Sequence, residues 1–128
     1  MEPQVIQEQT QKCPGMEFDP DMKTLKIEGR SIPENPESIY KPLKEWIIEH
    51  YETADGLNVK IILEYINSGS SKHLLEVLRM LKGYQDEGKG LAISWLYEED
   101  DELICDMGKE LQSSSKLNFE LREFEDND

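Results

Sequence analysis

Residues 58–66 read Asn-Val-Lys-Ile-Ile-Leu-Glu-Tyr-Ile, and a polar run of Asn-Ser-Gly-Ser-Ser follows at residues 67–71. Every second residue of the first run is apolar, beginning at Val59, which predicts a β-strand. Ile62 and Ile66 make the other side of this strand partly apolar, so we expect a central strand that is covered on both faces. The polar run is then expected to be the turn between this strand and a helix.

The chain after this turn alternates between helical and strand patterns. A strong helix is predicted to end near Gly88, and its apolar stripe holds Leu74, Val77, Leu78, Leu81 and Tyr84. A strand with alternating apolar residues is predicted from Leu91 to Tyr97. A third helix is predicted from about Asp100 to Gln112, with an inward face of Leu103, Ile104, Met107 and Leu111. The apolar residues of a final strand are Leu117, Phe119 and Leu121.

The chain before residue 58 predicts a hairpin and one helix. Short strands at Phe18 and at Thr24–Glu28 flank a turn signal over Asp19–Lys23. A helix is predicted from about Pro36, with a stripe of Ile39, Leu43, Trp46, Ile47 and Tyr51. Because Pro42 has no N–H to donate, we expect a kink or a late helix start near it.

The resulting order is β-β-α-β-α-β-α-β, which predicts a small α/β sandwich with a mixed sheet of about five strands and three main helices. A chain of 128 residues suits one domain. Residues 1–12 are rich in Gln and Glu and are expected to form a flexible N-terminal leader. We expect a single domain over residues 13–125 and an acidic tail at residues 126–128.

The charge balance excludes several classes of partner. The chain has 14 Lys and Arg against 28 Asp and Glu, a formal net charge of −14. Such a surface repels nucleic acid and anionic lipid, so we expect neither a nucleic-acid nor a membrane partner. No wholly apolar run exceeds three residues, and Cys13 and Cys105 are far apart. Two unpaired thiols and the absence of a signal-peptide pattern favour a soluble protein of the reducing cytoplasm.

No known catalytic motif is present. The sequence holds no Gly-rich phosphate loop and no Cys/His cluster, and the acidic run at residues 98–102 lacks the spacing of a calcium loop. We therefore expect neither a metal nor a cofactor. One enzymatic alternative is a small hydrolase that uses Ser68 or Ser70 with His73, although no GxSxG elbow surrounds these serines.

The polar turn has two interpretations. Ser68 or Ser70 is a candidate N-cap of the following helix, which is a purely structural role. Three serines and a glycine before a helix also make a good phosphoacceptor loop, because a phosphate there meets free N–H donors and the helix dipole.

Several groups of residues together resemble the SiaC family of bacterial regulatory phosphoproteins, whose fold is similar to that of STAS domains. The most characteristic group is the run from Gly29 to Asn35. The other groups are Phe18-Asp19-Pro20, Leu25 to Glu28, Tyr40 with Pro42, Leu43 and Trp46, Leu63 to Lys72, and Trp95-Leu96-Tyr97 followed by acidic residues. The resemblance spans about residues 15–124 and implies a STAS-like domain.

The resemblance implies a non-enzymatic switch. Family members are phosphorylated on a hydroxyl residue after the central strand by a cognate serine/threonine kinase, and a phosphatase reverses this. The phosphorylation state selects the bound partner, and the output is tied to a diguanylate cyclase, cyclic-di-GMP and biofilm formation. The family pattern is close to Tyr-x-Asn-Thr-Ser-Ser, and here Ser68 stands at the threonine and Gly69 at the next position. Ser68 is therefore the predicted phosphoacceptor, with Ser70 and Ser71 as runners-up.

Four further residues are expected to contact a phosphate or a partner: Asn67, Gly69, Lys72 and Arg30. Residues 66–97 carry four basic and three acidic residues, a net charge of +1, whereas residues 98–128 carry a net charge of −9. One added phosphate would therefore change the local sign of charge around the turn. A plainer alternative is an acidic binding module without a covalent switch.

Overall fold

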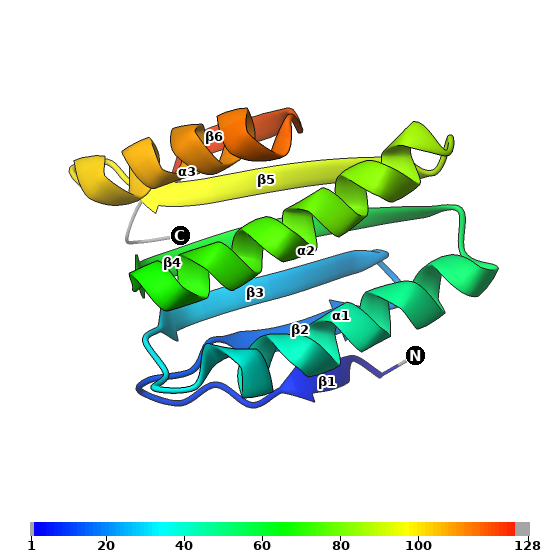
Figure 1. Cartoon of the computed structure of the whole chain (residues 1–128), viewed down its shortest axis with the longest axis horizontal. Helices are drawn as coiled ribbons and strands as arrows, with labels where there is room; N and C mark the ends of the chain where they lie inside the picture. The colour runs from blue at the N-terminus through cyan, green and yellow to red at the C-terminus, as the bar shows by residue number, and fades with distance from the viewer. Residues whose placement is uncertain (1, 125–128) are drawn as a thin grey trace.

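The structure is a computed structural model, and it describes residues 2–124 of the chain. Over this range the chain forms six strands and three helices (Figure 1). The strands are β1 (Gln4–Gln7), β2 (Gly15–Asp19), β3 (Thr24–Ser31), β4 (Gly56–Ile66), β5 (Gly90–Glu98) and β6 (Phe119–Phe124). The helices are α1 (Pro36–Thr53), α2 (Ser68–Asp86) and α3 (Glu102–Ser115). The predicted α/β class, mixed sheet and three main helices are confirmed.

The strands lie in one sheet in the order β1-β2-β3-β4-β5-β6. Strands β1, β2 and β3 pair with one another in antiparallel fashion, and β3 to β6 are parallel. Each helix connects one parallel strand to the strand directly beside it, and the chain always advances across the sheet in the same direction. Because such crossovers are right-handed, all three helices lie on one face of the sheet (Figure 1).

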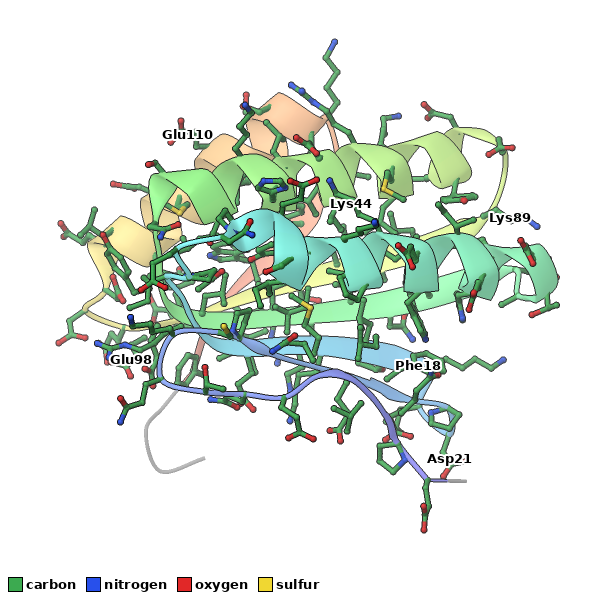
Figure 2. All side chains as sticks on the ribbon, turned by 60° about the horizontal axis from the view of Figure 1, so that its bottom comes forward. Phe18, Asp21, Lys44, Lys89, Glu98 and Glu110 are labelled. Atoms are coloured by element: carbon green, nitrogen blue, oxygen red, sulfur yellow. The ribbon has the colours of Figure 1, made fainter. Side chains whose placement is uncertain are left out.

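The prediction that β4 is covered on both faces is wrong. Leu57, Val59 and Ile61 are buried against the helices, whereas Asn58 and Lys60 point the other way and are exposed. No helix of the described chain packs on that second face, which Figure 2 shows on the far side of the sheet from the helices.

The sheet has six strands because residues 4–7 add an antiparallel edge strand to β2. This strand lies within the segment expected to be a flexible leader. It is tied to the domain by the indole N–H of Trp46, which donates to Gln4 Oε1 at 3.1 Å. A polar segment thus becomes ordered through backbone pairing and one side-chain hydrogen bond. The acidic tail expected at residues 126–128 lies outside the described residues.

The core lies between the helices and the inner face of the sheet. The predicted stripes of α1 and α2 supply most of the helical side, with Ile39 and Tyr84 only partly buried. The fully buried members of the two stripes are Leu43, Ile47, Leu74, Val77, Leu78 and Leu81. Each such side chain contributes about 1.5–3 kcal/mol of burial free energy.

The late-start alternative for α1 and the inward position of Leu103 in α3 are wrong. Helix α1 begins at Pro36 and continues through Pro42 to Thr53, so it does not start late. In α3, Ile104 and Leu111 face the core as predicted, but Leu103 is 74% exposed. Asp101 caps α3, its side chain accepting from Ile104 N at 3.0 Å. Because Ile104 and Leu111 define the face of α3 that packs on the core, Leu103 points away from that face into solvent.

Candidate functional site

The serine turn lies at the edge of the sheet where the parallel strands end. Helices α1, α2 and α3 all begin at this edge, because each follows the carboxyl end of a parallel strand (Figure 1). Glu98, the last residue of β5, lies at this end of the molecule, and Lys89 lies at the opposite end (Figure 2). The positive ends of three helix dipoles therefore face the same edge, which favours negative charge there.

Asn67 is the residue that fixes the start of α2. Its side-chain oxygen accepts a hydrogen bond from Ser70 N at 2.8 Å, and its carbonyl oxygen accepts from Ser71 N at 2.9 Å. Its own N–H donates to the carbonyl oxygen of Ser31 at 3.0 Å, which joins the turn to the end of β3. The expectation that Ser68 or Ser70 caps the helix is wrong, because the Asn67 amide already serves as the N-cap.

The serines after Asn67 differ sharply in exposure. α2 begins at Ser68, so residues 68–71 are its first turn rather than an irregular loop. Ser68 is exposed, Ser71 is half-buried and Ser70 is completely buried. Among these three serines, only Ser68 therefore presents its side chain freely to another protein.

A small polar cluster lies beneath this first turn. The hydroxyl oxygens of Ser31 and Tyr40 lie 2.8 Å apart in the protein interior. Burial raises the pKa of Tyr40 to about 12, and the hydrogen bond with Ser31 opposes this rise. Ser70 Oγ is also buried in this region and has no hydrogen-bond partner among the described residues.

Sequence reasoning missed Ser31 and Tyr40 as parts of this cluster. A signal for Ser31 was available, because Leu25 and Ile27 alternate inward along β3 and Ser31 continues the same period of two. Tyr40 occupies the α1 stripe one turn before Leu43, so its inward direction also follows the helical period.

His73 does not form a catalytic pair with these serines. Its ring stacks on Tyr40, with ring centroids 6.0 Å apart and an interplanar angle of 15°. Its buried Nδ1 has no hydrogen-bond partner in the described chain, and neither has Ser70 Oγ. Within residues 2–124 no hydrogen bond joins His73 to Ser68 either, so the hydrogen-bonded pair of base and nucleophile that a serine hydrolase uses is not formed in this structure.

The basic residues near the turn are exposed. Lys72 lies about one turn along α2 from Ser68, and no ion pair holds it within the part of the chain that is described. Arg30 Nε lies 3.8 Å from Glu64 Oε2 across the β3–β4 pair, so its guanidinium is directed to that carboxylate and not to Ser68. Both members of this ion pair are largely exposed, so the pairing is weak and easily exchanged.

Gly69 lies where α1 and α2 begin side by side. A Cβ at Gly69 would lie 3.4 Å from Pro36 Cγ. The structure therefore places residues 67–69 beside the start of α1. Arg30 is linked to this turn only indirectly, because Ser31, the next residue, accepts the hydrogen bond from Asn67 N.

The described residues hold no cluster of three metal-ligating side chains. In the same range no helix is both long enough and apolar enough to cross a membrane.

The chain is a small α/β domain that presents an exposed serine at the N-terminus of α2. The match to protein families gives its class, a regulatory phosphoprotein. The family model described as "SiaC family regulatory phosphoprotein" matches residues 7–124, and this chain belongs to that family.

Three relatives illustrate the likeness. An uncharacterized protein of Pseudomonas aeruginosa strain UCBPP-PA14 is 25% identical over 116 residues, which cover 88% of this chain and 90% of the relative. The crystal structure of apo-SiaC from Pseudomonas aeruginosa has a TM-score of 0.84 at 21% identity, covering 95% of this chain and 99% of that one. SiaC in the crystal structure of the diguanylate cyclase SiaD with its activator SiaC, also from Pseudomonas aeruginosa, has a TM-score of 0.84 at 21% identity. That match covers 91% of this chain and 96% of the other. At this identity the solved structures establish the fold.

Proposed function

We propose that this chain is a non-enzymatic signalling protein that is switched by phosphorylation of Ser68. A cognate serine/threonine kinase transfers the terminal phosphoryl group of ATP to Ser68 Oγ, ADP leaves, and the hydroxyl proton passes to solvent. A phosphatase hydrolyses the phosphoester with water and restores the serine. The observation that carries the proposal is the exposure of Ser68 at the first position of α2, where Ser70 is buried.

The choice among the serines follows from access. A kinase must align the acceptor oxygen with the transferred phosphorus, so a buried hydroxyl requires local unfolding first. Ser68 needs no such opening, Ser71 needs a partial one, and Ser70 needs the first turn of α2 to come apart. Ser71 and Ser70 therefore remain runners-up in that order.

A phosphate on Ser68 would enter an electrostatically favourable position. It adds about −1.5 to −2 charges at a helix N-terminus, where free N–H groups and the dipole attract anions. The backbone around Asn67 and Gly69 and the ammonium group of Lys72 are the groups that we expect to contact it. Arg30 could join them only by leaving Glu64.

The output partner that we propose is a diguanylate cyclase, which would link this chain to cyclic-di-GMP signalling and biofilm regulation in the bacterial cytoplasm. The solved complex of the cyclase SiaD with SiaC supports this choice. Tyr65 and Leu103 are 50% and 74% exposed near the same edge as Ser68. If the cyclase covers these apolar side chains, a phosphate beside them would weaken its binding.

Paired variants test the switch. Ser68→Ala and Ser68→Asp are used as baits against a purified cyclase and a purified kinase of the family, with Ser71→Ala as the matched control. We expect Ser68→Ala to bind the cyclase constitutively and to resist phosphorylation, Ser68→Asp to lose the cyclase, and Ser71→Ala to behave like the unmodified protein. If the three variants bind every partner alike and phosphate is absent from Ser68 across growth conditions, the chain is an acidic binding module without a switch.

A further inference from the structure

The sheet face that no helix of the described chain covers carries an apolar hollow near the carboxyl ends of β4, β5 and β6. It has a volume of about 200 Å³. The lining residues are Ile62, Leu63, Glu64, Glu98, Asp101 and Phe124. The hollow is lined by residues of β4, β5 and β6 and by Asp101, the N-cap of α3, and Ser68 is not among its lining residues.

Ile62, Leu63 and Phe124 give the hollow its apolar lining, and Ile62 belongs to a small apolar pair on this face of the sheet. Towards the amino ends of the strands the same face carries polar or small side chains, such as Lys60 and Ser94, which are direct neighbours. One step further along, Ile62 lies beside Leu96. Both are half-buried, and the three helices of the described chain all pack on the other face of the sheet (Figure 1). An apolar pair on an otherwise solvated sheet face indicates a surface that another molecule covers.

The rim of the hollow is acidic. Glu64, Glu98 and Asp101 line it, and none of the described residues that line it is basic. On the β4 side, Arg30 Nε lies 3.8 Å from Glu64 Oε2 in an exposed pair. On the β6 side, Arg122 Nε lies 3.6 Å from Glu120 Oε1. Both pairs are exposed enough to be exchanged at little cost.

This combination selects one kind of occupant. A second copy of a chain with a net charge of −14 would be repelled. We infer that the hollow is a docking site for a basic amphipathic segment of a partner protein. An aliphatic side chain of the segment enters over Ile62 and Phe124, and Lys or Arg side chains meet the carboxylates of the rim. This site is separate from the Ser68 switch and does not depend on phosphorylation.

Binding of a model peptide to the full chain tests the inference. The probe is a fluorescein-labelled helical peptide made only of Leu and Lys in amphipathic spacing, and oligolysine of equal charge is the control. We expect the Leu/Lys peptide to shift the backbone NMR signals of Ile62, Leu96 and Phe124, and oligolysine to give weak and scattered shifts. Scattered shifts with both peptides would show attraction by net charge alone and would overturn the inference.

Two matched sets of variants separate the apolar floor from the charge. Ile62→Ser should lower the affinity for the Leu/Lys peptide by about fivefold or more. Ile48→Ser, at an exposed isoleucine of α1, should leave that affinity unchanged. Glu64→Gln with Glu98→Gln should weaken binding more than Glu49→Gln with Glu52→Gln on α1, which removes the same charge. Equal effects within either set would refute the site. The glutamine pairs decide the question if Ile62→Ser does not fold.

Discussion

The side-chain oxygen of Asn67 accepts a hydrogen bond from the backbone N–H of Ser70 at 2.8 Å. The N–H of Asn67 donates to the carbonyl oxygen of Ser31 at 3.0 Å, so the same residue joins α2 to β3. Ser68 lies between these two anchors and is exposed. The position of the proposed phosphoacceptor therefore depends on the cap formed by its neighbour.

Asn67→Ala should lower the free energy of unfolding by about 1 kcal/mol, because the N–H of Ser70 loses its acceptor. Chemical denaturation followed by circular dichroism measures the change. Asn118→Ala is the control, since Asn118 is exposed and outside the helices. It should change stability by less than about 0.5 kcal/mol. Equal effects of the two substitutions would show that the Asn67 cap contributes little.

Ser68→Asp should stabilise the protein by about 0.3–1 kcal/mol at low ionic strength, because a carboxylate at the start of α2 interacts favourably with the helix dipole. Ser113→Asp, in the last turn of α3, adds the same charge at the unfavourable end and should destabilise by a similar amount. Thermal unfolding at low and high salt compares them. The difference in Tm between the two variants should shrink as salt rises, and a difference that salt leaves unchanged would contradict a dipole effect.

Hydrophobic periodicity predicted the helical stripes and the strands β2 to β6, because packing dictates those positions directly. It did not predict β1, since Gln4–Gln7 is mostly polar and is held by backbone pairing and by Trp46. It also wrongly predicted that both faces of β4 are covered. Ile62 makes the strand look buried on two faces, and only the sequential strand order, which places every helix on one side, shows otherwise.

The candidate site could be predicted in part. The resemblance to the family predicted Ser68 as the phosphoacceptor, because Ser68 follows the central strand at the position of the family's hydroxyl residue. The burial of Ser70 could not be predicted from composition, because it depends on the helix beginning one residue after Asn67. The hydrogen bond between Ser31 and Tyr40 joins two elements, so it requires the packing of α1 on β3 to be known.

Tyr40→Phe should lower the free energy of unfolding by about 1 kcal/mol near neutral pH, because Ser31 Oγ loses its partner. This deficit should narrow at high pH. Burial raises the folded-state pKa of Tyr40 from 10.0 to about 12, so the unfolded chain releases this proton first as pH rises. The contribution to stability is therefore complete below pH 10 and is lost as pH rises towards 12.

Urea unfolding of both proteins at several pH values between neutrality and pH 11 or so measures this convergence. Tyr51, whose pKa burial also raises to about 12, remains in both proteins, and its contribution cancels in the difference. A gap between wild type and Tyr40→Phe that stays constant with pH would show that Tyr40 ionises normally in the folded state.

Gly108→Ala should destabilise the protein strongly. Gly108 is buried in α3, and a Cβ there would lie 2.6 Å from Cδ1 and Nε1 of Trp95. The completely buried indole would have to move, and its N–H would lose its hydrogen bond to the carbonyl oxygen of Ile104, now 3.0 Å long. Overpacking of this kind costs about 1–3 kcal/mol, and a buried unpaired N–H adds to it.

Gly83→Ala is the matched control, because Gly83 also lies within a helix, and a Cβ added there would meet no atom of the described chain within 4 Å. Alanine there should raise the free energy of unfolding by about 0.5–1 kcal/mol through its higher helix propensity. If Gly→Ala lowers the free energy of unfolding at residue 108 and raises it at residue 83, the loss at residue 108 comes from the contact with Trp95 and not from helix propensity. If both variants were stabilised, α3 would have to lie further from β5 than the structure shows.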